Sequence, residues 1–172
     1  MIRTGMIRSY YSYDTMARPE FGVDIIIDTL QKLDIRPKDF LLIGGAAMVL
    51  QGAKAKTPDV DMLVSSGGWN KLLEELDTVF VADPPRRAVD AGADNQTLKI
   101  SGLPMPVEVT DRVGDGHYPI SFETHKEFEV YVYDVIPCLP LEMIHASKQA
   151  LARPRDIEDI TLIERKLGGI PI

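Results

Sequence analysis

Two aspartates stand two residues apart in the sequence: Asp61 interrupts the apolar run VDMLV, from Val60 to Val64, and Asp59 comes directly before this run. Alternate residues of a β-strand point to the same face, so the two carboxylates are expected to project side by side. Carboxylates this close repel each other, and either a proton on one of them or a cation between them relieves the repulsion. Their hard oxygen atoms suit Mg²⁺, which often takes its remaining ligands from the phosphates of a substrate. The pattern therefore predicts a site for Mg²⁺ or Mn²⁺.

A pair of glycines, Gly44 and Gly45, follows the apolar residues FLLI and precedes the aspartates by about fifteen residues. After a strand, glycines let the backbone come close to a ligand, and the N–H groups at the start of the next helix attract anions. An isolated Asp-x-Asp more often belongs to a solvated surface strand than to a site. The apolar flanks and the upstream glycines together favour a site, with phosphate-binding backbone beside metal-binding carboxylates.

The segment GGAAMVLQGAKAKTPDVDMLV resembles the signature of the nucleotidyltransferase superfamily related to DNA polymerase β. It is most similar to the small, minimal members, which include a toxin-like group associated with abortive infection. The positions that fit the family pattern are Gly44, Gly45, Gly52, Thr57, Asp59 and Asp61. Two positions depart from it: Ala55 stands where many members carry Arg, with Lys54 and Lys56 on either side, and Pro58 is a local peculiarity.

The family also uses a third carboxylate on a neighbouring strand, and the sequence MPVEVTD offers two. Glu108 and Asp111 are three residues apart, and residues at this spacing point to opposite faces of a strand. Glu108 stands between two valines, in the alternating pattern of a strand interior, whereas Asp111 stands at the strand's end. We therefore expect Glu108 to share the metal face. The catalytic and metal-binding residues that the resemblance implies are Asp59, Asp61 and Glu108.

The C-terminal sequence LPLEMIHASKQALARPRDIEDI is similar to the end of minimal nucleotidyltransferases, where a helix with a Lys precedes an Arg-rich turn and a helix that opens with Asp. The residues that fit this layout are Lys148, Arg153, Arg155, Asp156 and Asp159. A Lys that faces the cleft would hold triphosphate oxygens as a point charge, but a solvated helix face explains Lys148 equally well. For Arg153, Arg155 and Asp156 we expect a structural role in the turn. The substrate-binding residues implied by the resemblance are Gly44, Gly45, Lys56, Thr57 and Lys148.

The elements expected to position these residues are helix, strand, helix, strand, helix, several strands and then two helices. This order predicts an α+β domain, a nucleotidyltransferase-like mixed β-sheet flanked by helices with a C-terminal helical pair. Three strands are expected to be neighbours, at 41–43, 60–64 and 107–109. Residues 1–20, which are rich in tyrosine, are interpreted as a flexible arm, and residues 21–172 as a single domain. The sequence ADPPRRAVDAGADN is interpreted as a loop and EFEVYVYDVIPC as one strand.

The composition excludes several other classes of protein. With 26 acidic and 19 basic side chains the formal net charge is −7, which disfavours a general binder of the nucleic-acid backbone and leaves a local basic pocket open. The single cysteine, Cys138, excludes an internal disulfide, and the three histidines lack the spacing of a zinc site. No run reaches the roughly 18 apolar residues of a membrane helix, and the N-terminal sequence lacks the apolar core of a signal peptide. We expect a cytoplasmic protein with no membrane partner.

The function implied by the resemblance is a metal-dependent transfer of a nucleoside monophosphate from an NTP to a hydroxyl group, with release of pyrophosphate. The acceptor stays open between an RNA such as tRNA, a protein and a small molecule. The alternative is a nucleotidyltransferase-fold binding module without catalysis, a nucleotide sensor or a toxin–antitoxin partner, and Ala55 supports it. A structural metal-binding protein would leave the double glycine without a role. A homo-oligomer is compatible with the sequence.

Overall fold

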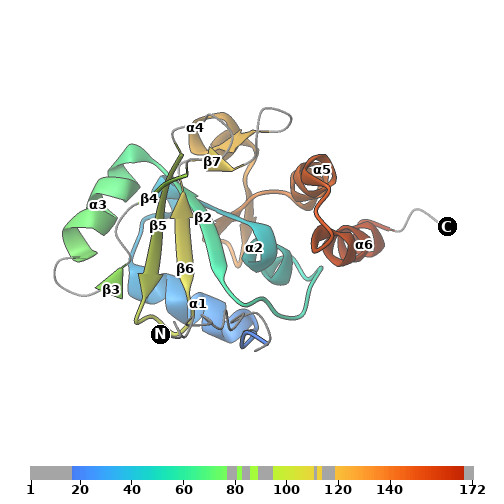
Figure 1. The fold of residues 1–172 in the computed structure, drawn as a ribbon, viewed down its shortest axis with the longest axis horizontal. Helices are drawn as coiled ribbons and strands as arrows, with labels where there is room; N and C mark the ends of the chain where they lie inside the picture. Colours follow the sequence, from blue (N-terminus) through green and yellow to red (C-terminus); the bar gives the residue numbers. More distant parts are fainter. Residues whose placement is uncertain are drawn as a thin grey trace, which may run out of the picture.

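The computed structural model describes residues 17–76, 81–82, 86–88, 95–110, 112–113 and 119–168. Within them, one mixed sheet has the strand order β3-β5-β6-β2-β1-β10-β9 with β4 paired to β5, and β7 and β8 form a second, small sheet (Figure 1). The strands are β1 (Phe40–Ile43), β2 (Val60–Val64), β3 (Val81–Ala82), β4 (Arg86–Ala88), β5 (Asn95–Ser101), β6 (Val107–Thr110), β7 (Arg112–Val113), β8 (Ile120–Ser121), β9 (Val130–Val132) and β10 (Ile136–Cys138). The helices are α1 (Val23–Leu33), α2 (Gly44–Leu50), α3 (Ser66–Leu76), α4 (Phe122–His125), α5 (Leu141–Leu151) and α6 (Asp156–Lys166), with 3₁₀ turns at Pro37–Asp39 and Lys126–Phe128. None of these described helices is long and apolar enough to cross a membrane.

The centre of the large sheet confirms the predicted α+β class and the predicted strand neighbours. β1 pairs antiparallel with β2, and β2 pairs parallel with β6. All four residues of β1 are buried, and in β2 only Asp61 is not fully buried. A continuous apolar strand suits a position covered on both faces, which is why FLLI and VDMLV occupy the middle of the sheet. The same position holds Asp61 in apolar surroundings.

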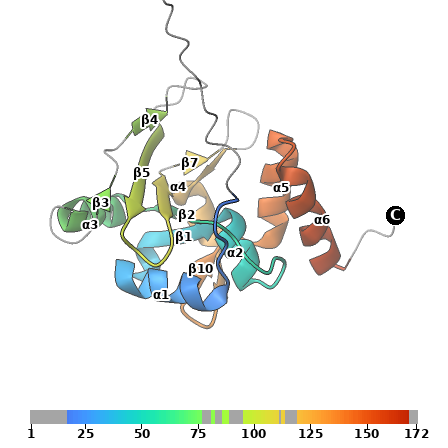
Figure 2. The same ribbon diagram turned by 60° about the horizontal axis from the view of Figure 1, so that its bottom comes forward.

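The two C-terminal helices lie side by side in both views, as the sequence predicts (Figures 1 and 2). α5 ends at Leu151, and its C-cap residue Ala152 adopts a left-handed conformation with φ 48°. Residues 153–155 then turn the chain into α6. α5 also packs against α2, the short helix that begins at the glycine pair. The helical pair therefore stands beside the segment that carries the predicted site.

Two expectations for the second half of the chain were wrong. EFEVYVYDVIPC is a hairpin, because β9 pairs antiparallel with β10, and Tyr133 and Asp134 take positive φ values of 52° and 63° in the turn between them. The sequence ADPPRRAVDAGADN, expected to be a loop, contains β4, which pairs with β5; its residues 83–85 and 89–94 lie outside the described residues. Neither feature has a side-chain signal as clear as an apolar alternation, since both depend on backbone hydrogen bonds to a strand that already exists.

The N-terminal segment joins the fold at Phe21. Its backbone exchanges two hydrogen bonds with Thr57, of 2.8 and 3.0 Å, and so attaches the segment beside the loop that carries Asp59. Residues 1–16 lie outside the described residues, so the flexible arm stays a prediction, as does the division into an arm and a single domain.

Candidate active site

Asp61 and Glu108 are direct neighbours on adjacent strands. The parallel pairing of β2 and β6 sets Asp61 opposite Glu108, so the two side chains share one face of the sheet. Asp59 stands immediately before β2, and all three residues line one cavity of about 580 Å³. The structure thus brings together the three carboxylates assigned from the sequence. Asp111, the alternative to Glu108, lies outside the described residues.

Asp61 carries the strongest electrostatic conflict in this cavity. Burial raises its pKa, and the nearby charges of Asp59 and Glu108 raise it further, to about 7. The positive charges of Lys148 and Arg155 act in the opposite direction and do not cancel the increase. Without a cation, Asp61 is therefore close to the midpoint of its titration at neutral pH. A cation between the carboxylates would favour the charged form.

The donor atoms suit a divalent cation, although they do not form a complete cage. Within the described part of the chain, no three His, Cys, Asp or Glu side chains are arranged to hold a metal ion. The Nζ of Lys99 lies 3.7 Å from the carboxylate of Glu108 and partly balances its charge. Mg²⁺ commonly binds through one or two carboxylates and completes its shell with water and substrate phosphates. The carboxyl oxygens present therefore fit an Mg²⁺ or Mn²⁺ site that a triphosphate would complete.

The glycine pair is required by the side chains that face it. Gly44 has φ +59°, and a Cβ at this position would stand 2.9 Å from Oδ2 of Asp61. A Cβ on Gly45 would overlap Oγ1 of Thr57. Both glycines line the cavity, so the backbone at this wall is exposed to a ligand without intervening side chains. Their phosphate contact stays a prediction, but their place beside Asp61 is observed.

Thr57 is almost fully buried beneath Gly45. Its hydroxyl donates to the carbonyl oxygen of Asp59 at 3.4 Å, and its backbone pairs with Phe21. Thr57 therefore supports the position of Asp59 and leaves little surface for a ligand, since its exposed fraction is 2%. The predicted substrate contact of Thr57 stays untested.

Lys148 lines the same cavity from α5 and is held by two aspartates of α6. Its Nζ lies 3.1 Å from Oδ1 of Asp156 and 2.8 Å from Oδ2 of Asp159. Arg153 adds two hydrogen bonds to Asp156, of 2.6 and 3.0 Å. This is the structural role predicted for Arg153 and Asp156. Lys148 is not on a solvated helix face, because its side chain is largely buried between these aspartates at the cavity wall. Its contact with triphosphate oxygens stays a prediction.

The two α6 aspartates differ from Asp61 in their electrostatics. Burial alone would raise the pKa of Asp156, but hydrogen bonds from Arg153 and Lys148 outweigh burial and hold the pKa below its usual value. Asp159 behaves in the same way, with hydrogen bonds from Lys148 and Lys54. These carboxylates are therefore charged at neutral pH and already have their counter-charges.

The loop before β2 presents Lys54, rather than Lys56, to the cavity. Nζ of Lys54 lies 2.7 Å from Oδ1 of Asp159, and Lys54 is among the residues that line the cavity. Lys56 is exposed and is not among those lining residues. The structure therefore does not bring the predicted substrate contact Lys56 to the site. The two lysines alternate in an irregular loop, where spacing alone could not tell which one faces inward.

Besides Lys54 and Arg153, three further cations among the described residues line the cavity without a site assignment from the sequence. Lys99 faces it because β5 pairs with β6 in a register that sets Lys99 opposite Glu108; strand alternation could have identified it once that pairing was known. Arg155 lines the cavity too, and its charge reaches Asp61, which exceeds the purely structural role expected for it. Arg18 enters from the N-terminal segment, and no sequence pattern indicates its position.

The overall fold resembles those of solved structures. The structure resembles ANT(2")-Ia in complex with adenylyl-2"-tobramycin with a TM-score of 0.51 and 14% identity, covering 84% of this chain and 87% of that one. It resembles the lincosamide antibiotic adenylyltransferase LnuA, lincomycin-bound, with a TM-score of 0.50 and 16% identity, covering 81% of this chain and 92% of that one. The chain has a minimal nucleotidyltransferase fold. At these identities the likeness establishes the fold and leaves the reaction to the residues of the site. Comparison of the sequence with protein-family models and with curated proteins gave no match.

Proposed function

We propose that this protein transfers a nucleoside monophosphate from an NTP to an acceptor hydroxyl and releases pyrophosphate. The observation that carries the proposal is the pairing of Asp61 with Glu108 in one cavity with Asp59, a cavity that the cation Lys148 also lines. A cavity that holds repelling carboxylates on one wall and a lysine on another suits a ligand that brings both phosphates and divalent cations.

Each wall of the cavity has a separate task in this reaction. Asp59, Asp61 and Glu108 would hold Mg²⁺ or Mn²⁺, which when bound supplies Lewis-acid activation of the acceptor oxygen and neutralises the triphosphate. Glu108 is suitably placed beside Asp61 to accept the proton of the acceptor hydroxyl. Lys148 and Arg155 offer positive charge to the phosphates and to the departing pyrophosphate. The side-chain-free wall at Gly44 lets those phosphates approach the backbone.

The acceptor belongs to one of three classes: an RNA end, a protein hydroxyl or a small molecule. Of two proteins of similar fold, one forms a complex with adenylyl-2"-tobramycin and the other is named as a lincosamide antibiotic adenylyltransferase. That likeness supports hydroxylated small molecules as the first acceptors to test. The net charge of −7 makes a large RNA the least favoured of the three.

The test is incubation with each α-labelled NTP, Mg²⁺ and a cell extract, followed by identification of the labelled product. The expected result is label on an acceptor together with released pyrophosphate, lost when EDTA is added. Asp59→Asn should lose the transfer, whereas the exposed surface change Asp28→Asn should not. NTP binding without transfer to any acceptor would favour the binding module instead. Absence of metal-dependent NTP binding would overturn both functions.

A further inference from the structure

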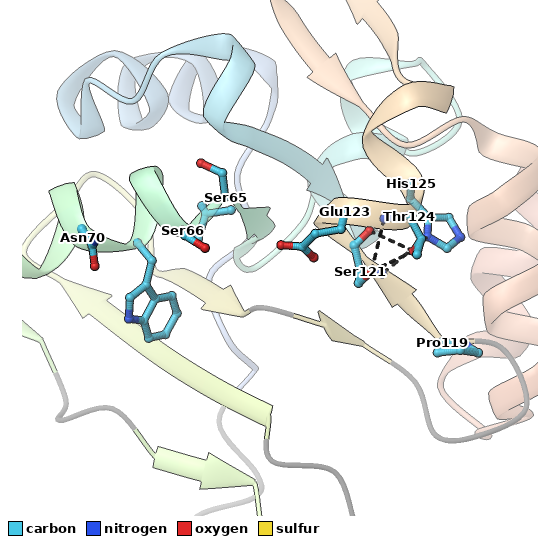
Figure 3. A pocket seen from close by; sticks show the side chains of 10 residues that line it. Ser65, Ser66, Asn70, Pro119, Ser121, Glu123, Thr124 and His125 are labelled. Carbon is cyan, nitrogen blue, oxygen red and sulfur yellow. Dashed lines mark hydrogen bonds between the residues drawn. The ribbon is translucent and has the colours of Figure 1, made fainter.

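A second cavity, of about 780 Å³, lies on the other side of β8 from the catalytic cavity. Consecutive residues of β8 separate them, because Ile120 lines the catalytic cavity and Ser121 lines the second one. The two cavities share none of their described lining residues. α3 and α4 form opposite walls of the second cavity, with Ser66 and Asn70 on one and Glu123 on the other (Figure 3). This cavity has no task in the reaction proposed above.

The wall formed by α4 has one carboxylate that is not engaged. The hydroxyls of Ser121 and Thr124 lie 2.7 Å apart, and Thr124 also bonds Nδ1 of His125 at 2.7 Å. These groups largely satisfy one another and fix the start of α4, where Ser121 is the N-cap. Glu123 is exposed, and within the described residues its carboxylate has no hydrogen bond or ion pair. In Figure 3 it extends from α4 toward α3.

The wall formed by α3 supplies an aromatic surface. Trp69 is half-buried and lines the cavity, with the polar side chains of Ser66 and Asn70 beside it on the same helix. No Lys or Arg is among the described lining residues, so the cavity offers little to a phosphate or another anion. A tryptophan ring and a carboxylate both attract an organic cation, the first through its π-face and the second through its charge.

We propose that this second cavity binds an organic ammonium ion, with Trp69 against the cationic group and Glu123 as its counter-charge. The net charge of −7 adds a general attraction for cations in the surrounding solution. The hydroxyl and amide groups of Ser66 and Asn70 can bind a polar substituent on the ligand. Because this cavity shares no described lining residue with the one that holds Asp61, its ligand should bind without NTP or divalent cations.

Trp69 makes the proposal directly measurable because it is the only tryptophan of the chain. Titration with choline at constant ionic strength should give a saturable change in tryptophan fluorescence, with a Kd on the order of 1 mM or below. The uncharged analogue 3,3-dimethylbutan-1-ol, which has a similar shape, should bind much more weakly. Calorimetry of the same titrations detects binding that leaves the fluorescence unchanged. No saturable signal in either measurement, or equal affinity for the uncharged analogue, would overturn the proposal.

Substitution of the carboxylate supplies the second test. Glu123→Gln keeps the size of an exposed side chain, so the protein should fold normally, and it should weaken choline binding about fivefold, as expected for loss of one exposed charge pair. Glu142→Gln, an exposed position on α5, is the matched control and should leave the affinity unchanged. Equal weakening by both variants would show general charge attraction in place of a site. The choline titrations need no NTP, so they stand whether or not nucleotidyl transfer is found.

Discussion

Asp61 and Asp156 line the same cavity, yet their surroundings drive their pKa values in opposite directions. Asp61 is largely buried beside two other acids, and its pKa rises to about 7. Asp156 is also buried, but Arg153 and Lys148 hold its pKa below the usual value. The comparison separates two tasks for one residue type. A carboxylate that is paired with positive side chains stabilises the fold. A carboxylate without enough positive charge around it is suited to bind a cation that a ligand brings.

The largest expected effect is that of Asp61→Asn on transfer. The variant loses a ligand charge for the divalent cation, which should cost several kcal/mol of transition-state stabilisation and reduce the rate by about a thousandfold or more. The fold should not be destabilised, because the substitution removes the repulsion from Asp59 and Glu108. A transfer assay with Mg²⁺ beside thermal melting in EDTA measures both effects.

The pH dependence of the melting temperature tests whether the pKa of Asp61 is raised in the folded protein. A carboxylate whose pKa is higher in the folded than in the unfolded state binds a proton on folding, so it favours folding at low pH and loses this advantage as the pH rises through about 7. The asparagine side chain of the variant does not titrate and has no such dependence. The Tm of Asp61→Asn should therefore exceed that of the native protein at pH 8 to 9, and the difference should shrink toward pH 5. If Asp61→Asn melts well below the native protein and still transfers nucleotide, Asp61 stabilises the fold and does not bind the catalytic cation.

Asp156→Asn should have the opposite balance of effects. The change leaves Arg153 and Lys148 with less counter-charge in a buried place, and we expect a loss of about 2 kcal/mol in the free energy of unfolding at pH 7. Because the folded-state pKa of Asp156 is lowered, its stabilisation is present above its unfolded pKa and is lost as the pH falls through the folded value. Urea unfolding from pH 7 down to pH 3 should therefore show the difference between native protein and variant diminishing.

The control for this prediction is Glu158→Gln, an exposed carboxylate of the same helix. It should change the free energy of unfolding by less than about 0.5 kcal/mol. If Asp156→Asn were as stable as this control but inactive, Asp156 would act on the substrate and the distinction between the two aspartates would fail.

The contacts in this cavity are predictable from the sequence only where a local pattern marks both residues. Asp61 is predictable from its spacing to Asp59 next to an apolar strand, and Glu108 from the alternation in VEVT. The two residues lie side by side because β2 and β6 are neighbouring strands. The contact between Lys54 and Asp159 joins residues 105 positions apart, and no local pattern encodes it. The hairpin turn at Tyr133 and Asp134 was missed for another reason, since its positive φ values occur without a glycine.

The smallest predicted effect distinguishes Lys54 from Lys56, two lysines of one loop with different surroundings. Lys54→Ala removes a counter-charge from Asp159 and a cation from the cavity wall. We expect a loss of about 1 kcal/mol in stability and a KM for NTP several-fold higher, because Asp159 would then oppose the phosphates. Lys56→Ala is the matched control, and an exposed position outside the cavity should change neither quantity measurably. A larger increase in KM for Lys56→Ala than for Lys54→Ala would mean that Lys56 contacts the substrate, as the family resemblance implies. The ion pair of Lys54 with Asp159 would then not identify the lysine that binds NTP.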